Sequence, residues 1–235
     1  MGPIFPGKRR KILIVASHPD DEVLGCGATA ARLVREGHRL EILILGEGIF
    51  SRYSKRSEAS TRRLVRLQEN AKAVGALLGA RSVRFERLPD NRFDELPILE
   101  IVKKVEKHIG RVRPEVVFTH HPGDLNVDHR ATFRAVLTAS RPVPGCPVKE
   151  LYAFEVLSST EWAFQQIQPA FKPDTFIEVS GTLGIKIRGM KRYRGESRSF
   201  PHPRSSEAIR SAARKWGSVV GVPAAEAFEL VRAAR

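Results

Sequence analysis

Short apolar runs alternate along this chain with longer segments of helical periodicity. The runs are rich in Val, Ile and Leu, which is typical of buried strands, and they lie at 11–17, 39–45, 82–88, 115–120, 150–157 and 175–179. Between them, apolar residues recur at the spacing of an amphipathic helix. We expect one helix from Asp20 to a stop at Gly37, and others at 58–78, 96–109, 128–141, 183–192 and 207–217. This alternation predicts a Rossmann-like three-layer α/β/α fold with a mostly parallel sheet.

Composition narrows the class of protein. The chain has 235 residues, 42% of them hydrophobic, which excludes wholesale disorder. It shows no repeat or linker, so we expect a single domain over 1–235 with residues 1–10 flexible. Two cysteines exclude a disulfide framework and a four-cysteine zinc site. The apolar runs are too short for a membrane span or a secretory signal, so we expect a cytoplasmic protein.

The charge is strongly positive. Lys and Arg number 40 against 26 Asp and Glu, a formal net charge of +14. Such a charge suits an anionic partner, but a solvated basic surface is the favoured explanation because the basic residues are spread along the chain. The densest basic clusters lie at 62–66, 81–87 and 186–204. No nucleic-acid-binding motif accompanies them, so we expect no nucleic acid partner, while an anionic small substrate stays open.

A first polar constellation, Ser17-His18-Pro19-Asp20-Asp21-Glu22, directly follows the first predicted strand. Ligands of open α/β sheets bind outside the carboxyl ends of the strands, where this segment lies. One imidazole and one carboxylate there would ligate a divalent metal, and a second carboxylate would remain as a base. The alternative is an ordinary cluster of helix N-capping residues.

A second constellation follows the fourth predicted strand and reads His120-His121-Pro-Gly-Asp124-Leu-Asn126-Val-Asp128-His129. A solvated polar loop would explain any one of these residues. Strands 1 and 4 are neighbours at the switch point of many doubly wound sheets, however, so the two loops are expected to converge. A site of two histidines, one carboxylate and an open position fits catalytic Zn²⁺, and Fe²⁺ or Mn²⁺ fits nearly as well.

A third feature, at residues 25–30, matches the loose dinucleotide fingerprint G-x-G-x-x-A. In that fingerprint the glycines form the turn directly after the strand. Here they fall inside the first predicted helix, which favours close packing of helix on sheet over binding of NAD.

The paired constellations resemble those of the PIG-L/LmbE-like de-N-acetylases, and the resemblance covers most of the chain. It rests on His18-Pro19-Asp20-Asp21-Glu22 and, about 100 residues later, Asp124-x-Asn126-x-Asp128-His129. The segment Leu88-Pro89-Asp90-Asn91-Arg92 and the tail through Ala225-Glu226-Ala227-Phe228 also resemble the family.

The resemblance implies a role for each matching residue. His18, Asp21 and His129 are the implied metal ligands, and Asp20 is the general base. Asp128 matches an aspartate that orients a neighbouring histidine, but this chain has Asn126 at that position. The donor to the oxyanion is therefore sought in His202 or in the amide of Asn126. Implied substrate contacts are Arg52, Asp90 and Asp124.

The resemblance therefore implies a zinc-dependent hydrolase that removes acetate from a small molecule containing an N-acetylhexosamine. A phosphorylated or nucleotide-linked form of the sugar stays open as the substrate, and the protein is expected to form a homo-oligomer. Two alternatives stay open. One is an amide hydrolase acting on a non-sugar acyl group. The other is a non-catalytic protein that binds metal or nucleic acid on the same fold.

Overall fold

The computed structural model describes residues 2–48 and 61–234. Within them one sheet runs in the order β3-β2-β1-β4-β5-β7-β6. Its strands are β1 (Lys11–Ala16), β2 (Arg39–Gly46), β3 (Ser82–Leu88), β4 (Val116–His120), β5 (Glu150–Phe154), β6 (Thr175–Glu178) and β7 (Ala225–Ala233). The first five strands are mutually parallel, and β7 is antiparallel to both β5 and β6. The predicted mostly parallel α/β sheet is confirmed.

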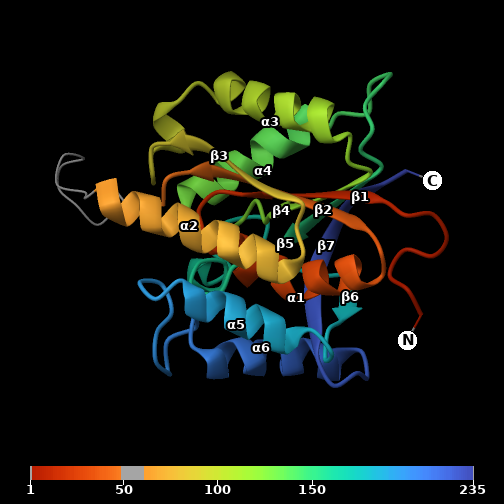
Figure 1. Ribbon diagram of the computed structural model, residues 1–235, viewed down its shortest axis with the longest axis vertical. Helices are drawn as coiled ribbons and strands as arrows, with labels where there is room; N and C mark the ends of the chain where they lie inside the picture. The colour runs from red at the N-terminus through yellow and green to blue at the C-terminus, as the bar shows by residue number, and fades with distance from the viewer. Residues whose placement is uncertain (1, 49–60, 235) are drawn as a thin grey trace.

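Helices cover both faces of the sheet (Figure 1). One layer contains α3 (Ile98–Val112) and α4 (Val127–Ala139); the other contains α1 (Asp21–Arg35), α2 (Thr61–Leu78), α5 (Leu183–Arg192) and α6 (Ser206–Val219). Successive strand residues point to opposite faces. Ile12 and Ile14 therefore pack in the core beneath α1, whereas Leu13 and Val15 pack in the core beneath α3.

Local sequence explains most helix ends, with two corrections. The first helix stops before Gly37, which has a φ of 91°. The prediction that Gly110 ends the third helix is wrong, because α3 continues to Val112 and stops where Arg113 adopts a φ of 50° before Pro114. The fourth helix begins at Val127 and not at Asp128, because the side chain of Asn126 caps it by accepting from the Asp128 backbone N–H.

The glycines of residues 25–30 serve packing. They lie inside α1, at the point where it crosses the sheet. A Cβ atom at Gly25 would lie 2.3 Å from the ring of Phe154 on β5. Helix and strand therefore approach more closely than any larger residue allows, as the packing interpretation of this segment predicted.

The last strand was not predicted. The sequence of β7 mixes charged and apolar residues without clear alternation, so its pattern does not distinguish strand from helix. Its pairing on both sides, with β5 and β6, makes it a strand.

Near the N-terminus, Phe5 is buried and packs edge-on against His38.

Candidate active site

The two polar constellations converge. β1 and β4 are hydrogen-bonded neighbours at the centre of the sheet, and the loop after each strand opens at the same edge. A cavity of about 610 Å³ lies there. Among the residues that line it are His18, Asp20 and Asp21 from the first constellation and Asn126 and His129 from the second.

Three side chains form a compact set of metal-ligand atoms. Those of His18, Asp21 and His129 are buried, and one ligand atom of each lies within 4.8 Å of the others. Asp21 Oδ2 is 3.5 Å from His18 Nδ1 and 3.3 Å from His129 Nε2. Two imidazoles and one carboxylate arranged in this way match the donor set of a catalytic zinc site.

The electrostatics of the cluster also suit a cation. Burial alone would raise the pKa of Asp21, but His129 and His120 outweigh it and hold that pKa well below its usual value. Burial opposes protonation of His129, yet Asp21 and Asp124 raise its pKa to about 9. The two carboxylates thus favour the positively charged form of the His129 imidazole. A divalent ion bound by the same atoms would supply the positive charge that these carboxylates favour.

Asp128 orients the first histidine. Its Oδ2 accepts a hydrogen bond from His18 Nε2 at 2.8 Å, which leaves His18 Nδ1 directed toward Asp21. The backbone N–H groups of Asn91 and Phe93 also donate to Asp128. The resemblance implied that the carboxylate of Asp128 orients the side chain at position 126, and the structure corrects this expectation. The carboxylate contacts His18 instead and holds this candidate ligand in position, as carboxylates behind metal-bound histidines do.

Asp124 plays the same part for the second histidine. Its Oδ1 lies 3.0 Å from His129 Nδ1, and the hydroxyls of Ser159 and Thr160 donate to its carboxylate. Burial would raise the pKa of Asp124, but His129 and these donors lower it to about 2. Asp124 is fully buried, so the expectation that it contacts substrate is corrected: it orients His129 from behind.

Asp20 lies beside the ligand set in a strained backbone conformation. Its φ is 117°, a region that non-glycine residues seldom occupy and that is often found at functional sites. The Asp20 carboxylate accepts a hydrogen bond from Arg204 Nη1 at 2.9 Å. Burial raises its pKa, Arg204 lowers it and Asp21 raises it further, with the net result well above the usual value. A carboxyl group of raised pKa is a stronger proton acceptor, as a general base requires.

Glu22 supports the turn that carries Asp20. Its Oε2 accepts the backbone N–H of Asp20 at 2.9 Å, and the Tyr193 hydroxyl donates to its Oε1 at 2.5 Å. Burial raises the pKa of Glu22 to about 7. These contacts connect the strained turn to the end of α5.

Of the four other predicted site residues, two line the cavity, one lies outside it and one is not described. Asp90 lines the cavity, with Oδ1 3.2 Å from His18 Nε2, and Asn126 lines it while capping α4. Arg52 lies outside the described residues. His202 is not among the cavity-lining residues; its ring packs edge-on against Trp162 at 5.6 Å between centroids.

Arg204 reaches the site from the tail of the chain, as Glu196 does, and the sequence pattern did not single it out. Its Nη1 bonds to both Asp20 and Glu196 at 2.9 Å, and its Nε donates to Ser158 Oγ at 2.6 Å. The only signal in the sequence was its position at the end of the basic cluster 186–204.

His120 was visible in the sequence pattern but received no role. Its Nε2 accepts the backbone N–H of Ser17 at 2.8 Å, and its ring stacks on that of His129 at 4.0 Å. Burial lowers the pKa of His120 well below its usual value, and His129 lowers it further. A neutral His120 therefore joins the ends of β1 and β4 beneath the site.

These features define a Rossmann-like α/β protein whose sheet carries a buried His/Asp cluster, suited to a divalent cation, at its switch point. Comparison with family models assigns the protein to one family. The chain belongs to the PIG-L family, described as GlcNAc-PI de-N-acetylase, whose model matches residues 13–140. The family resemblance stated from the sequence is confirmed.

Individual relatives support the same family. The chain is 24% identical to diacetylchitobiose deacetylase of Thermococcus kodakarensis, over 94% of this chain and 83% of the relative. Its fold is similar to that of N,N′-diacetylchitobiose deacetylase from Pyrococcus horikoshii (TM-score 0.75, 18% identity, 95% of this chain and 84% of that one). It is equally similar to that of GalB, a 4-carboxy-2-hydroxymuconate hydratase from Pseudomonas putida (TM-score 0.76, 20% identity, 96% and 98%). At these identities the structural likeness shows the fold alone.

None of the helices in residues 2–48 and 61–234 is both long and apolar enough to cross a membrane.

Proposed function

We propose that this protein is a metal-dependent N-deacetylase that releases acetate from a small molecule containing N-acetylglucosamine. The observation that carries the proposal is the convergence of His18, Asp21 and His129 on one another, with the Asp20 carboxyl beside them in the same cavity. The family and the diacetylchitobiose deacetylase relative support the choice of substrate class.

His18, Asp21 and His129 would hold Zn²⁺, with Fe²⁺ or Mn²⁺ as alternatives. When bound, the cation supplies polarisation of the acetamide carbonyl and makes water more acidic. Asp128 and Asp124 keep the two histidine rings oriented, so the donor atoms are in place before the cation arrives.

Asp20 accepts the proton of the attacking water and later passes it to the leaving amine. Its raised pKa and its position outside the ligand set suit this role. Arg204 holds the Asp20 carboxylate at 2.9 Å and lines the same cavity, which makes it our candidate donor to the oxyanion in place of His202.

The cavity is suited to a sugar. Its volume of about 610 Å³ falls in the usual range for small-molecule sites. Trp162 lines it and is 40% exposed, so its ring offers an apolar surface on which a pyranose ring can lie. Asp90 and Asn126, also on the wall, provide polar groups for sugar hydroxyls.

The experiment that tests this proposal measures metal and product together. We expect about one divalent ion per chain by elemental analysis, and acetate release from a panel of N-acetylglucosamine derivatives. His129→Ala should lose both the metal and the activity. A neighbour of the same fold is a hydratase, so acetate release, and not metal content, decides the reaction. Full metal content in His129→Ala would overturn the ligand assignment, and absence of acetate from the whole panel would overturn the function.

Cytoplasmic location and homo-oligomer formation remain predictions. Light scattering on the purified protein tests the second: a mass of one chain across the working concentration range would contradict it.

A further inference from the structure

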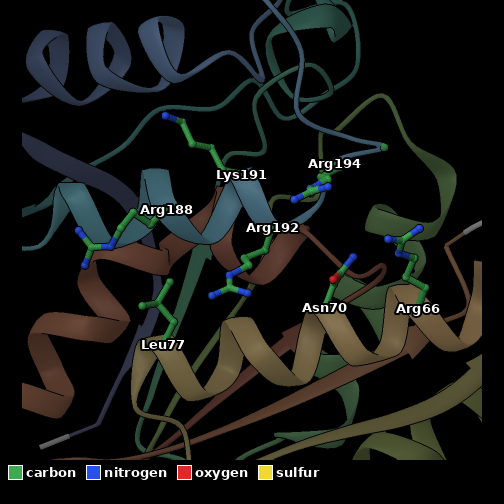
Figure 2. A pocket seen from close by; sticks show the side chains of 8 residues that line it. Arg66, Asn70, Leu77, Arg188, Lys191, Arg192 and Arg194 are labelled. Carbon is green, nitrogen blue, oxygen red and sulfur yellow. The ribbon is translucent and has the colours of Figure 1, made fainter.

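A second cavity, of about 700 Å³, lies between α2 and α5 (Figure 2). We call it the α2–α5 groove. Arg66 and Asn70 line it from α2, Arg188, Lys191 and Arg192 line it from α5, and Arg194 follows at the end of α5. Five cationic side chains thus line one concave surface, four of them from the two helices and Arg194 from the chain just after α5. In Figure 2, Arg192 lies in the space between the helices, and Lys191 points away from α2.

Carboxylates of the part of the chain that the structure describes do not neutralise the positive charge of this groove. No Asp or Glu is among the lining residues within 2–48 and 61–234. Within the described chain, none of its five cationic side chains makes an ion pair with a carboxylate. Arg204, by contrast, contacts two carboxylates in the neighbouring cavity. Like charges gathered in a concavity repel one another and favour an anion that bridges them.

The groove adjoins the candidate active site. Gly195 lines the groove and the next residue, Glu196, lines the catalytic cavity, so one stretch of chain separates the two. A ligand that occupies both cavities would have its acetamide near Asp20 and would pass residues 195 and 196 toward Arg194. A scattered basic surface would have no such relation to the site.

Arginine favours phosphate among possible anions. Its planar guanidinium donates two parallel hydrogen bonds to phosphate oxygens, and four of the five cationic residues here are Arg. The volume is that of a small-molecule site. We propose that the α2–α5 groove binds the phosphate or pyrophosphate group of a phosphorylated or nucleotide-linked N-acetylglucosamine substrate. This inference rests on the deacetylase function proposed above and adds the substrate class.

The first test measures binding without catalysis. Uridine monophosphate carries the phosphate but no acetyl group, and its affinity for the metal-loaded protein can be followed by titration calorimetry. The test variant is Arg66→Gln with Arg192→Gln, one change on each wall. The control is Lys103→Gln with Arg134→Gln, which removes the same charge from exposed positions on α3 and α4, across the sheet.

We expect the groove variant to bind uridine monophosphate at least about tenfold more weakly than wild type and the control to stay within about twofold. Binding to wild type should weaken as salt rises. Equal losses in both double variants would show a diffuse charge effect and overturn the proposal. Unchanged binding in the groove variant, as expected if the nucleotide sits on the metal, would overturn it too.

The second test asks whether the bound phosphate belongs to the substrate. We expect kcat/KM for UDP-N-acetylglucosamine to exceed that for N-acetylglucosamine, and the ratio of the two to fall about tenfold in the groove variant, through KM. A variant that loses nucleotide binding but keeps this ratio would show a site for a free anion and overturn the assignment to substrate. If neither sugar releases acetate, the deacetylase function fails, while the calorimetry still tests the groove.

Discussion

At the scale of single residues, Asp20 combines three properties that seldom occur together. Its backbone is strained, its carboxyl is buried, and an arginine holds that carboxyl beside the candidate ligands. Strain of this kind costs about 1–3 kcal/mol and persists only where surrounding contacts enforce it. Here the contacts come from Glu22, which binds the Asp20 backbone N–H, and from Tyr193 behind it.

The first prediction concerns this residue. Asp20→Asn keeps the size of the side chain but removes the proton acceptor, so turnover should fall about 10²–10⁴-fold. The metal content should stay at the wild-type level because Asp20 is outside the ligand set. Acetate release and elemental analysis on the same sample check both statements. Loss of metal in this variant would make Asp20 a ligand, and near-normal turnover would remove it from the mechanism.

A second prediction separates Arg204 from His202. Arg204 bonds to Asp20, whereas His202 packs edge-on against Trp162 and accepts a hydrogen bond from the Arg204 backbone N–H. Loss of one preorganised donor to an oxyanion typically costs about 10²–10³-fold in kcat. We therefore expect Arg204→Gln to lower kcat by about that factor and His202→Gln to lower it much less. Stopped assays at saturating substrate measure both, and the reverse order would restore His202 as the donor.

At the scale of elements, the site depends on how closely α1 lies on the sheet. The N-terminus of α1 carries Asp21, and the helix crosses the sheet at Gly25, next to the ring of Phe154. This close approach sets how far the turn that carries His18 and Asp21 lies above the ends of the strands. The same contact explains why a glycine occupies position 25 of a helix, where it otherwise costs about 1 kcal/mol relative to alanine.

The third prediction follows from this contact. Gly25→Ala places a Cβ atom where the Phe154 ring lies, so the free energy of unfolding should fall by about 1–3 kcal/mol. Gly110→Ala is the matched control, because it also lies in a helix but no atom lies within 4 Å of the added Cβ. The control should be neutral or stabilising by up to about 1 kcal/mol. Urea denaturation of the three proteins compares them; equal stability of both variants would contradict the packing argument.

At the scale of the whole molecule, the candidate metal connects two halves of the parallel sheet. Two ligands come from the loop after β1 and the start of α1, and the third comes from α4. A cation bound only by the folded arrangement therefore stabilises the fold by mass action. Buried polar contacts such as that of His120 with Ser17 already join β1 and β4 there.

The fourth prediction is that removing the metal lowers the melting temperature. A cation present at about 100 times its Kd contributes about 2.7 kcal/mol, which for a chain of this size corresponds to roughly 5–10 °C. Differential scanning calorimetry before and after chelation, followed by readdition of zinc, measures the shift. His129→Ala should melt at the same temperature with and without the chelator. A chelator effect of equal size in His129→Ala would place the stabilising ion elsewhere.

Much of the fold could be predicted from local sequence. Five parallel strands, the helices between them and the stop at Gly37 depend on apolar periodicity and turn residues within short windows, and the structure confirms them. The third helix passes Gly110 because the left-handed Arg113 and then Pro114, three and four positions later, end it instead. β7 was missed because only its pairing with β5 and β6 distinguishes it from a helix.

The sequence by itself determined the chemistry available at the site: histidines and carboxylates placed directly after two buried strands. The tertiary structure alone decided their roles. Asp128 orients His18 because strand order brings the loops after β1 and β4 together. Asp124 is held behind His129 by the hydroxyls of Ser159 and Thr160, and Arg204 reaches Asp20 from a position 184 residues away. The groove between α2 and α5 likewise collects arginines from segments more than 100 residues apart. Periodicity is a property of neighbouring residues, whereas these contacts depend on which elements pack side by side.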